Sequence, residues 1–218
     1  MNKYKVLFID WHNTLSTSLF WEHLKDIKHP HHNLFHLLQP LPPEIHQGTF
    51  TSWMRGSVTS EEVVHLMAQL LHLDYDLIFQ EFILSCQQMQ FVSKEIVYLI
   101  SILRRQGIKV VVATNNTDSF SRWTVPGMKL NDIFYSVINS FDVKALKWDV
   151  DEKERSLFFA DFLYANGIQS GESMLIDDND TEMARVRTQS FGIEYRHIEP
   201  GIGLVPELRK IITSLDKE

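Results

Sequence analysis

Three short runs of consecutive apolar residues each stop at a polar residue. They are residues 6–9 before Asp10, residues 110–113 before Thr114, and residues 174–176 before Asp177 and Asp178. Unbroken apolar runs of this length are typical of strands buried on both faces, as in parallel sheets sandwiched between helices. Two further strands are predicted over residues 133–138 and 193–198. The pattern therefore predicts an α/β fold with a Rossmann-like parallel sheet and helices on both faces.

Helical patterns fill the intervals between these runs. Residues 94–106 place apolar side chains on one helical face, with Ser93 as a candidate cap and Gly107 just beyond the end. A second helix is predicted over residues 152–166, before Gly167. Each helix leads into the next strand, as the crossover connections of a parallel sheet require.

The segment between the first two apolar runs is also predicted to be helical. Thr59 to Glu62 form a capping-box pattern before one amphipathic helix, and a second helix is expected from Asp76. We therefore predict two domains, an α/β core domain of residues 1–15 and 92–218 and a small α-helical cap domain of residues 16–91. Trp53 and Arg55 are candidates for substrate contact.

Composition and charge limit the classes of function. The 218 residues are 44% apolar and 22% charged, with a net charge of −7 and a single cysteine, Cys86. One cysteine cannot form an intrachain disulfide, and no apolar stretch approaches the length of a membrane span, so we expect a soluble, cytoplasmic protein. Scattered basic residues argue against binding to a nucleic-acid backbone. The sequence does not predict the oligomeric state.

A histidine-rich stretch lies within the predicted cap domain. It comprises His29, His31, His32 and His36, next to Pro30. No other type of metal ligand accompanies these histidines along the chain, so the stretch is predicted to be a solvated polar segment rather than a metal site.

Polar residues end several of the predicted strands. Asp10, Thr114, Asp177 and Asp178 all follow apolar runs. In open parallel sheets the carboxyl ends of the strands meet at one edge, where ligands bind. Three carboxylates brought together there repel one another unless a cation or a substrate offsets their charge. The pattern therefore predicts a divalent-metal site at this edge.

At these positions the chain resembles the haloacid dehalogenase-like hydrolases. FIDWHNTLS, with Asp10 and Thr14 in register, resembles the opening motif of that family. VVVATNN resembles the strand that ends in Ser or Thr, and MLIDDNDTEMA resembles the paired acidic motif. The segment from Phe159 through Gly167 to Asp177 also matches the family's spacing of helix, glycine and strand.

The resemblance implies a reaction and a set of roles. It implies a Mg²⁺-dependent phosphatase acting on a small phosphorylated metabolite, with Asp10 forming an aspartyl-phosphate. Thr114 and Asn115 would bind the transferring group, and Mg²⁺ would be held by Asp10, the carbonyl of residue 12, Asp177 and Asp178, with Glu182 in support. A lysine would offset the charge of that group. Lys147 is the favoured candidate, with Asp149 as a candidate N-cap of the next helix; Lys144 and Lys153 are the alternatives.

The sequence departs from the family's pattern at position 12. His12 stands where the phosphatases of the family have a second Asp that protonates the leaving group. An imidazole, whose ordinary pKa is about 6.5, can also act as an acid and a base near neutral pH. His12 also leaves two alternatives open. One is cleavage of a carbon–halogen or carbon–phosphorus bond, the latter requiring a cap lysine such as Lys25 or Lys28. The other is a non-catalytic binding protein on the same fold.

Overall fold

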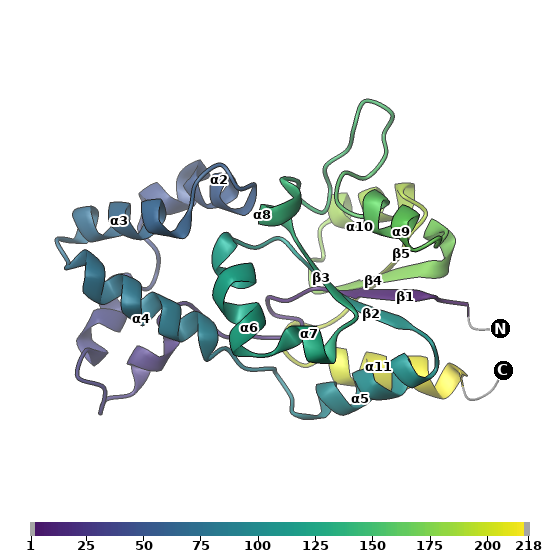
Figure 1. The fold of residues 1–218 in the computed structure, drawn as a ribbon, viewed down its shortest axis with the longest axis horizontal. Helices are drawn as coiled ribbons and strands as arrows, with labels where there is room; N and C mark the ends of the chain where they lie inside the picture. The colour runs from purple at the N-terminus through teal and green to yellow at the C-terminus, as the bar shows by residue number, and fades with distance from the viewer. Residues whose placement is uncertain (1–2, 216–218) are drawn as a thin grey trace.

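A five-stranded parallel sheet forms the centre of the molecule. The computed structural model describes residues 3–215. The strands lie in the order β3-β2-β1-β4-β5 (Figure 1). Their bounds are β1 Val6–Ile9, β2 Lys109–Thr114, β3 Ser136–Asn139, β4 Ser173–Asp177 and β5 Glu194–His197. All four pairings are parallel, so the predicted α/β fold with a Rossmann-like sheet is confirmed.

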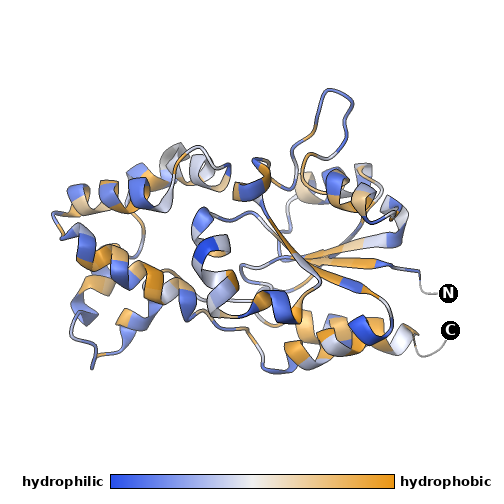
Figure 2. Cartoon of the chain, in the orientation of Figure 1, coloured by the Kyte–Doolittle hydropathy of each residue, from blue (hydrophilic) through white to orange (hydrophobic). Residues whose placement is uncertain are grey.

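Alternate side chains of the strands face two different helical layers. Leu7 and Ile9 belong to a hydrophobic cluster with α5 (Glu95–Arg105) and α11 (Leu204–Leu215). Val6 and Phe8 point to the other face, into a cluster that includes Leu163 of α9 (Ala160–Ala165). In Figure 1, α10 (Glu182–Ser190) lies beside α9 on this second face. Burial on both faces explains the continuous apolar runs, which stand out as the hydrophobic strands of Figure 2.

The segment between β1 and α5 forms a helical layer beside the sheet. Its two long helices are α3 (Ser60–Leu71) and α4 (Tyr75–Gln87). The predicted capping box is present. The Thr59 side chain accepts the backbone N–H of Glu62, and the Glu62 side chain accepts the backbone N–H of Thr59. Asp74 caps α4. Residues 22–54 contain shorter elements: η1 Glu22–Lys25, η2 His32–Leu34, α1 Phe35–Leu38, η3 Ile45–Thr49 and α2 Phe50–Met54.

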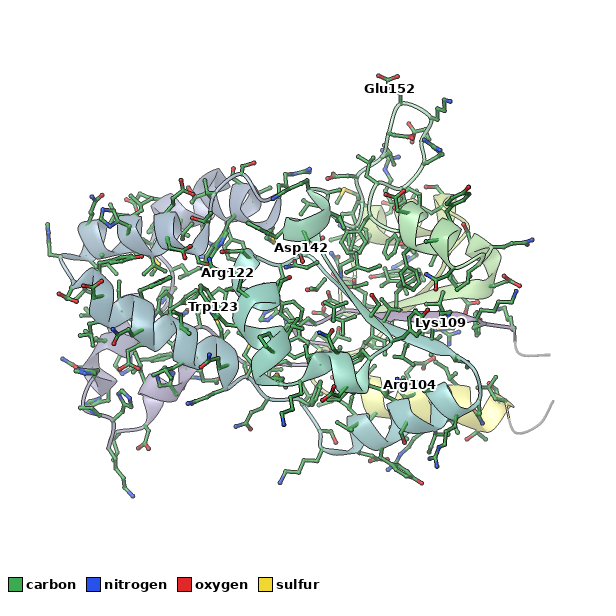
Figure 3. The ribbon with its side chains drawn as sticks, in the orientation of Figure 1. Arg104, Lys109, Arg122, Trp123, Asp142 and Glu152 are labelled. Atoms are coloured by element: carbon green, nitrogen blue, oxygen red, sulfur yellow. The ribbon has the colours of Figure 1, made fainter. Side chains whose placement is uncertain are left out.

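The helical segment has a hydrophobic core of its own. Trp21, Trp53, Met67 and Phe82 are fully or almost fully buried within it. Aromatic contacts then join this core to the rest of the chain, since Trp123 packs edge-on against Phe82 at 5.8 Å between ring centroids (Figure 3). No helix within residues 3–215 is long and apolar enough to cross a membrane.

Short elements connect β2, β3 and β4. After β2 come η4 (Phe120–Thr124), α6 (Val125–Gly127) and α7 (Leu130–Ile133), and after β3 come α8 (Ser140–Val143), α9 and η5 (Ser170–Glu172). The strand predicted over residues 133–138 is therefore shifted, because its first residue ends α7 and the strand itself begins at Ser136.

The helix predicted over residues 152–166 is wrong in its first half, because helix α9 begins only at Ala160. Asp151 accepts backbone N–H bonds from Lys153 and Arg155, and Ser156 accepts those of Phe158 and Phe159. These side-chain acceptors replace the helical hydrogen bonds and close a tight turn instead. Figure 3 shows the result, with Glu152 at the tip of a loop that projects from the domain.

Candidate active site

The order of the strands brings distant carboxylates together. β1 lies between β2 and β4. From β1 the chain adds β2 and β3 on one side and then returns to add β4 and β5 on the other, so the strand order reverses at β1. Asp10 follows β1 directly, and its backbone N–H donates to the carbonyl of Ile176 at 3.0 Å. Asp177 ends β4. Because parallel strands end at the same edge, both carboxylates lie at the switch point, where open α/β sheets bind their ligands.

Lys147 lies between these two carboxylates. Its Nζ donates to Asp10 Oδ1 at 2.5 Å and to Asp177 Oδ2 at 2.6 Å. All three side chains are buried. The backbone N–H of Lys147 donates to Asn115 Oδ1 at 2.9 Å, which fixes the loop that carries the lysine against the end of β2. A buried charge is costly unless it is paired, so the lysine and the carboxylates stabilise each other.

The burial of this cluster shifts its proton equilibria. Burial raises the pKa of Asp10 to about 7, although the charge of Lys147 opposes the shift, and Asp177 adds to it. For Lys147, burial alone lowers the pKa, but the charges of Asp10 and Asp177 outweigh it and raise that pKa above its ordinary value. The two carboxylates therefore favour the charged form of Lys147, while burial disfavours the charged form of Asp10.

A divalent cation fits the remaining oxygen atoms. Asp10, Asp177 and Asp178 each offer a carboxylate oxygen, and these oxygens lie within 4.8 Å of one another. Thr14 Oγ1 donates to Asp178 Oδ1 at 3.4 Å, which orients the third carboxylate. The donor set consists of oxygen alone, which suits Mg²⁺ better than the transition metals.

Thr114 and Asn115 continue from the end of β2. The Thr114 side chain is buried, and its hydroxyl has no hydrogen-bond partner among the described residues. Buried hydroxyls usually have partners, so this one is unusual, although Thr114 is not among the residues that line the neighbouring cavity. Asn115 lines the cavity that contains Asp10, Lys147 and Asp178, which has a volume of about 550 Å³.

His12 lies at the boundary between this cavity and a second one. It lines the polar cavity with Asp10, and it also lines a neighbouring chamber of about 360 Å³. Asn115 is shared in the same way. Desolvation by the surrounding protein lowers the pKa of His12, and the charge of Asp178 opposes that shift. His12 therefore lies beside both the carboxylates and the chamber.

The second chamber is largely apolar. The core domain contributes Trp11 and Asn116, and the helical segment contributes most of the other walls: Leu19, Phe20, Leu41, Phe50 and Met89. Its polar side chains include Ser18, Gln39 and His46. No Asp, Glu, Lys or Arg among the described residues lines it. The chamber can therefore hold an uncharged group with apolar surface.

The overall arrangement is shared with several solved structures. A predicted HAD-like family hydrolase from Porphyromonas gingivalis is 16% identical, covers 99% of each chain and has a TM-score of 0.64. The chain has the haloacid dehalogenase-like fold. A HAD family enzyme from Bacteroides thetaiotaomicron in complex with magnesium is 20% identical over 91% of this chain and 95% of that one, with a TM-score of 0.65. The L-2-haloacid dehalogenase from Xanthobacter autotrophicus is 14% identical over 89% of this chain and 77% of that one, with a TM-score of 0.60.

The similarity is found by comparing structures and not by comparing sequences. No protein-family model and no curated protein matches this chain. The haloacid dehalogenase-like fold is therefore identified from its three-dimensional arrangement.

Within this fold, several residues considered from the sequence lie outside the site. Lys144 donates to the carbonyl of Gly56, and Lys153 lies in the exposed turn, so neither reaches the carboxylates. Trp53 is buried and its indole donates to Asp118 at 2.7 Å, so it is a structural residue of the helical segment and not a substrate contact. Glu182 is exposed in the first turn of α10.

Asp149 and Arg55 also differ from what the sequence indicates. Asp149 caps no helix and instead accepts the backbone N–H of Leu146 at 2.8 Å. Arg55 pairs with that same carboxylate, so its guanidinium is engaged in a contact between the helical segment and the core.

Other polar residues of the cavity escaped the sequence analysis. They are Asn179, Asp180 and His197, together with Trp148 and Pro200. His197 ends β5, and its ring nitrogen Nε2 lies 3.2 Å from the carbonyl of Asp178. The predicted strand over residues 193–198 is not a continuous apolar run, so the pattern of apolar runs that end at a polar residue does not mark His197.

Proposed function

We propose that this protein is a Mg²⁺-dependent hydrolase of small phosphomonoesters that forms an aspartyl-phosphate on Asp10. The single observation that carries the proposal is the position of Lys147, whose Nζ bridges Asp10 and Asp177 in a polar cavity. A fixed cation beside a carboxylate nucleophile suits the transfer of an anionic phosphoryl group. It reduces the electrostatic repulsion between the negatively charged carboxylate and the negatively charged phosphate.

The chain's own residues account for both halves of the reaction. A carboxylate oxygen of Asp10 attacks phosphorus, and the bond from phosphorus to the leaving oxygen breaks. His12 gives that oxygen a proton and afterwards takes one from the water that hydrolyses the aspartyl-phosphate. Inorganic phosphate and free Asp10 are then restored. The Thr114 hydroxyl and the Asn115 amide hold the phosphoryl oxygens, and Lys147 offsets their charge.

The acidic cluster supplies the metal site of the proposal. Asp10, Asp178 and the backbone carbonyl of His12 would hold Mg²⁺, with Asp177 in support. The bound ion would offset the charge of the phosphoryl group and favour the ionised form of Asp10.

The apolar chamber indicates the class of leaving group. It adjoins the polar cavity through His12 and Asn115, and no formally charged side chain of the described residues lines it. A leaving group with a second phosphate or a carboxylate would lose its hydration there without gaining a partner. We therefore propose a neutral alcohol with apolar surface as the leaving group.

The alternative reactions have less support. Cleavage of a carbon–phosphorus bond was expected to need Lys25 or Lys28, but neither lines the polar cavity or the chamber, and Lys25 pairs with Glu22. Displacement of halide needs no metal, so it does not explain why Asp177 and Asp178 are clustered with Asp10. A non-catalytic role would leave the buried lysine unexplained, since a hydrophobic group of similar volume is often at least as stabilising.

A turnover screen tests the proposal. Purified protein is incubated with neutral-alcohol phosphates, sugar bisphosphates and 2-haloacids, with Mg²⁺ or with EDTA, and phosphate or halide is measured. Phosphate release that requires Mg²⁺ and is lost in Asp10→Asn supports the proposal. The matched control is Asp161→Asn, which changes an exposed acid on α9. Halide release without metal, or full activity of Asp10→Asn, would contradict it.

A further inference from the structure

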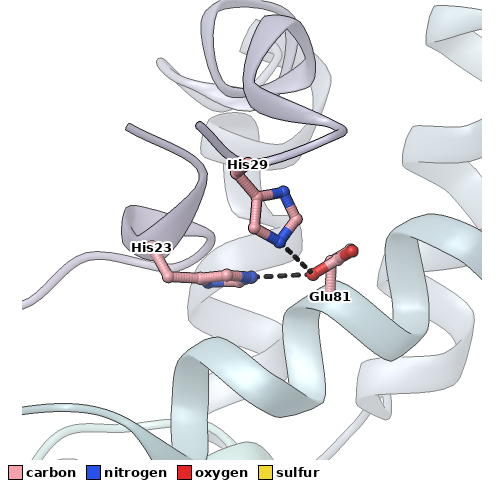
Figure 4. Close-up of side chains that lie close together, drawn as sticks. All are labelled: His23, His29 and Glu81. Carbon is pink, nitrogen blue, oxygen red and sulfur yellow. Dashed lines mark hydrogen bonds and ion pairs between the residues drawn. The ribbon is translucent and has the colours of Figure 1, made fainter. Parts of the chain in front are cut away.

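Two histidines and one glutamate converge in the helical segment, away from the proposed active site. His23 belongs to η1, His29 lies in the turn that follows, and Glu81 lies on α4 (Figure 4). His23 Nε2 lies 2.7 Å from Glu81 Oε2, and His29 Nε2 lies 3.8 Å from the same oxygen. One ligand atom from each residue lies within 4.8 Å of the other two. All three side chains thus point to one spot.

The charges and hydrogen bonds of this cluster are incomplete. Glu81 is buried, and its contacts within residues 3–215 are the two histidines, of which only His23 is within hydrogen-bond distance. His23 Nδ1 is also buried and has no partner in the described chain. When both imidazoles are neutral, this buried carboxylate has no cation beside it, a costly arrangement that a bound metal ion would relieve.

We propose that His23, His29 and Glu81 form a binding site for a transition-metal dication, with Zn²⁺ as the preferred ion. Two imidazoles and one carboxylate with an open fourth position are a ligand set that zinc uses. Two ligands about 2.0–2.1 Å from a tetrahedral zinc ion lie about 3.3 Å apart, and the observed separations of 2.7 and 3.8 Å lie on either side of this value.

The nitrogen ligands separate this site from the acidic cluster. Asp10, Asp177 and Asp178 offer only carboxylate oxygens, which suit Mg²⁺. Imidazole nitrogen instead favours zinc and its neighbours over Mg²⁺. The two sites should therefore bind different ions in the same solution.

Binding has a defined consequence for His29. The backbone N–H of His31 donates to His29 Nδ1 at 3.2 Å, so in the metal-free protein a neutral His29 carries its proton on Nε2. Coordination through Nε2 requires the proton on Nδ1, which opens the bond to His31. A change of tautomer at His29 is therefore expected when the metal binds.

The site joins the short elements that follow Trp21 to the long helix α4. Residues 22–49 contain helices of three to five residues only, whereas α4 has 13. A metal ion shared by His23, His29 and Glu81 would fasten the short elements to the long helix. Since the ion binds only the folded segment, it raises the stability of the protein.

Calorimetric titration of the whole protein with Zn²⁺, in the presence of excess Mg²⁺ to occupy the acidic cluster, tests the inference. One zinc ion should bind the wild type. The zinc affinity should fall by more than about 100-fold in His29→Ala and in Glu81→Gln, because removing a ligand lowers metal affinity more than removing a residue that only supports a ligand. Glu81→Gln keeps the shape of the side chain and a hydrogen bond to His23, so it retains the fold. His36→Ala, which removes an exposed histidine of α1, is the matched control.

Nitrogen-15 NMR of the imidazoles provides an independent readout. Zinc should shift the Nε2 signal of His29 and move its proton to Nδ1, and it should raise the melting temperature of the wild type but not of His29→Ala. Equal zinc affinity in wild type and His29→Ala, or no binding to the folded wild type, would overturn the inference.

Discussion

Arg55 of the helical segment forms a two-pronged ion pair with Asp149 of the core, two residues after Lys147. Arg55 Nη2 donates to Asp149 Oδ1 at 2.8 Å, and Nη1 donates to Oδ2. Oδ2 also accepts the backbone N–H of Leu146, so Asp149 shapes the loop that presents Lys147. The helical segment is thereby linked to the position of the lysine between Asp10 and Asp177.

We expect Arg55→Ala to lower turnover without unfolding the protein. The ion pair is partly exposed, so its loss should change the free energy of unfolding by only about 0–1 kcal/mol. Freed from Asp149, the loop should hold Lys147 less firmly, and a small displacement of a positioned group can lower the rate by about 100-fold. Steady-state kinetics and urea unfolding measure both quantities.

Arg209→Ala is the matched control for this variant. Arg209 makes the same kind of two-pronged pair with Glu95 on the α5–α11 side, away from the cavity. If both variants lower kcat equally, the link between Arg55 and Lys147 is not responsible.

His12→Ala should discriminate between substrates by their leaving groups. Alkyl phosphates need a proton on the leaving oxygen, and His12 lines both the polar cavity and the chamber that would hold the alcohol. Their hydrolysis should therefore slow by about 10²–10⁴-fold, while p-nitrophenyl phosphate, whose leaving group is stable without a proton, should be spared. Equal slowing of both substrates would show that His12 is not the proton donor.

Lys147→Met should destabilise the fold as well as abolish activity. The substitution leaves Asp10 and Asp177 buried without their shared cation, and breaking a buried ion pair from one side typically costs about 3–5 kcal/mol. Adding Asp10→Asn to Lys147→Met removes one of the two orphaned charges and should recover part of that loss. Denaturant unfolding of the single and double variants measures it; a single variant as stable as wild type would contradict the ion-pair geometry.

A pH-dependent contribution to stability is expected from Glu194 on β5. Partial burial alone raises the pKa of this carboxyl, but hydrogen bonds from Lys3, Tyr4 and Arg196 lower it to about 2, against an ordinary value of 4.5. A depressed pKa in the folded state stabilises the protein above the unfolded pKa. The contribution should therefore be present above pH 4.5 and be lost as the pH falls toward 2.

Melting curves of Glu194→Gln and wild type measure this contribution. The difference between their melting temperatures should be constant above pH 4.5 and shrink as the pH falls below it. Glu152→Gln, which changes an exposed side chain at the tip of the projecting loop, is the matched control. A difference that does not change with pH would contradict the hydrogen bonds drawn to Glu194.

The strand-end residues Asp10, Thr114, Asp177 and Asp178 could be found from the sequence for a simple physical reason. A strand buried on both faces must be apolar throughout, so the first polar residue marks its end, and parallel strands end at one edge. The same regularity predicted the α/β fold, but it does not select His197, because β5 is an edge strand without a continuous apolar run.

Other parts of the molecule depend on contacts between segments that are distant in sequence. Lys144, Lys147 and Lys153 differ little as sequence, but Lys147 contacts Asp10 and Asp177 from a loop that Asn115 and Asp149 hold by hydrogen bonds. The carboxylates near the histidine-rich stretch along the chain are Glu22 and Asp26, yet the one that α4 brings to His23 and His29 is Glu81. The sequence by itself determined which residues are buried in the sheet and which end its strands, because those follow from local periodicity. Only the tertiary structure decided which side chains meet across loops and helices, because packing rather than spacing sets those distances.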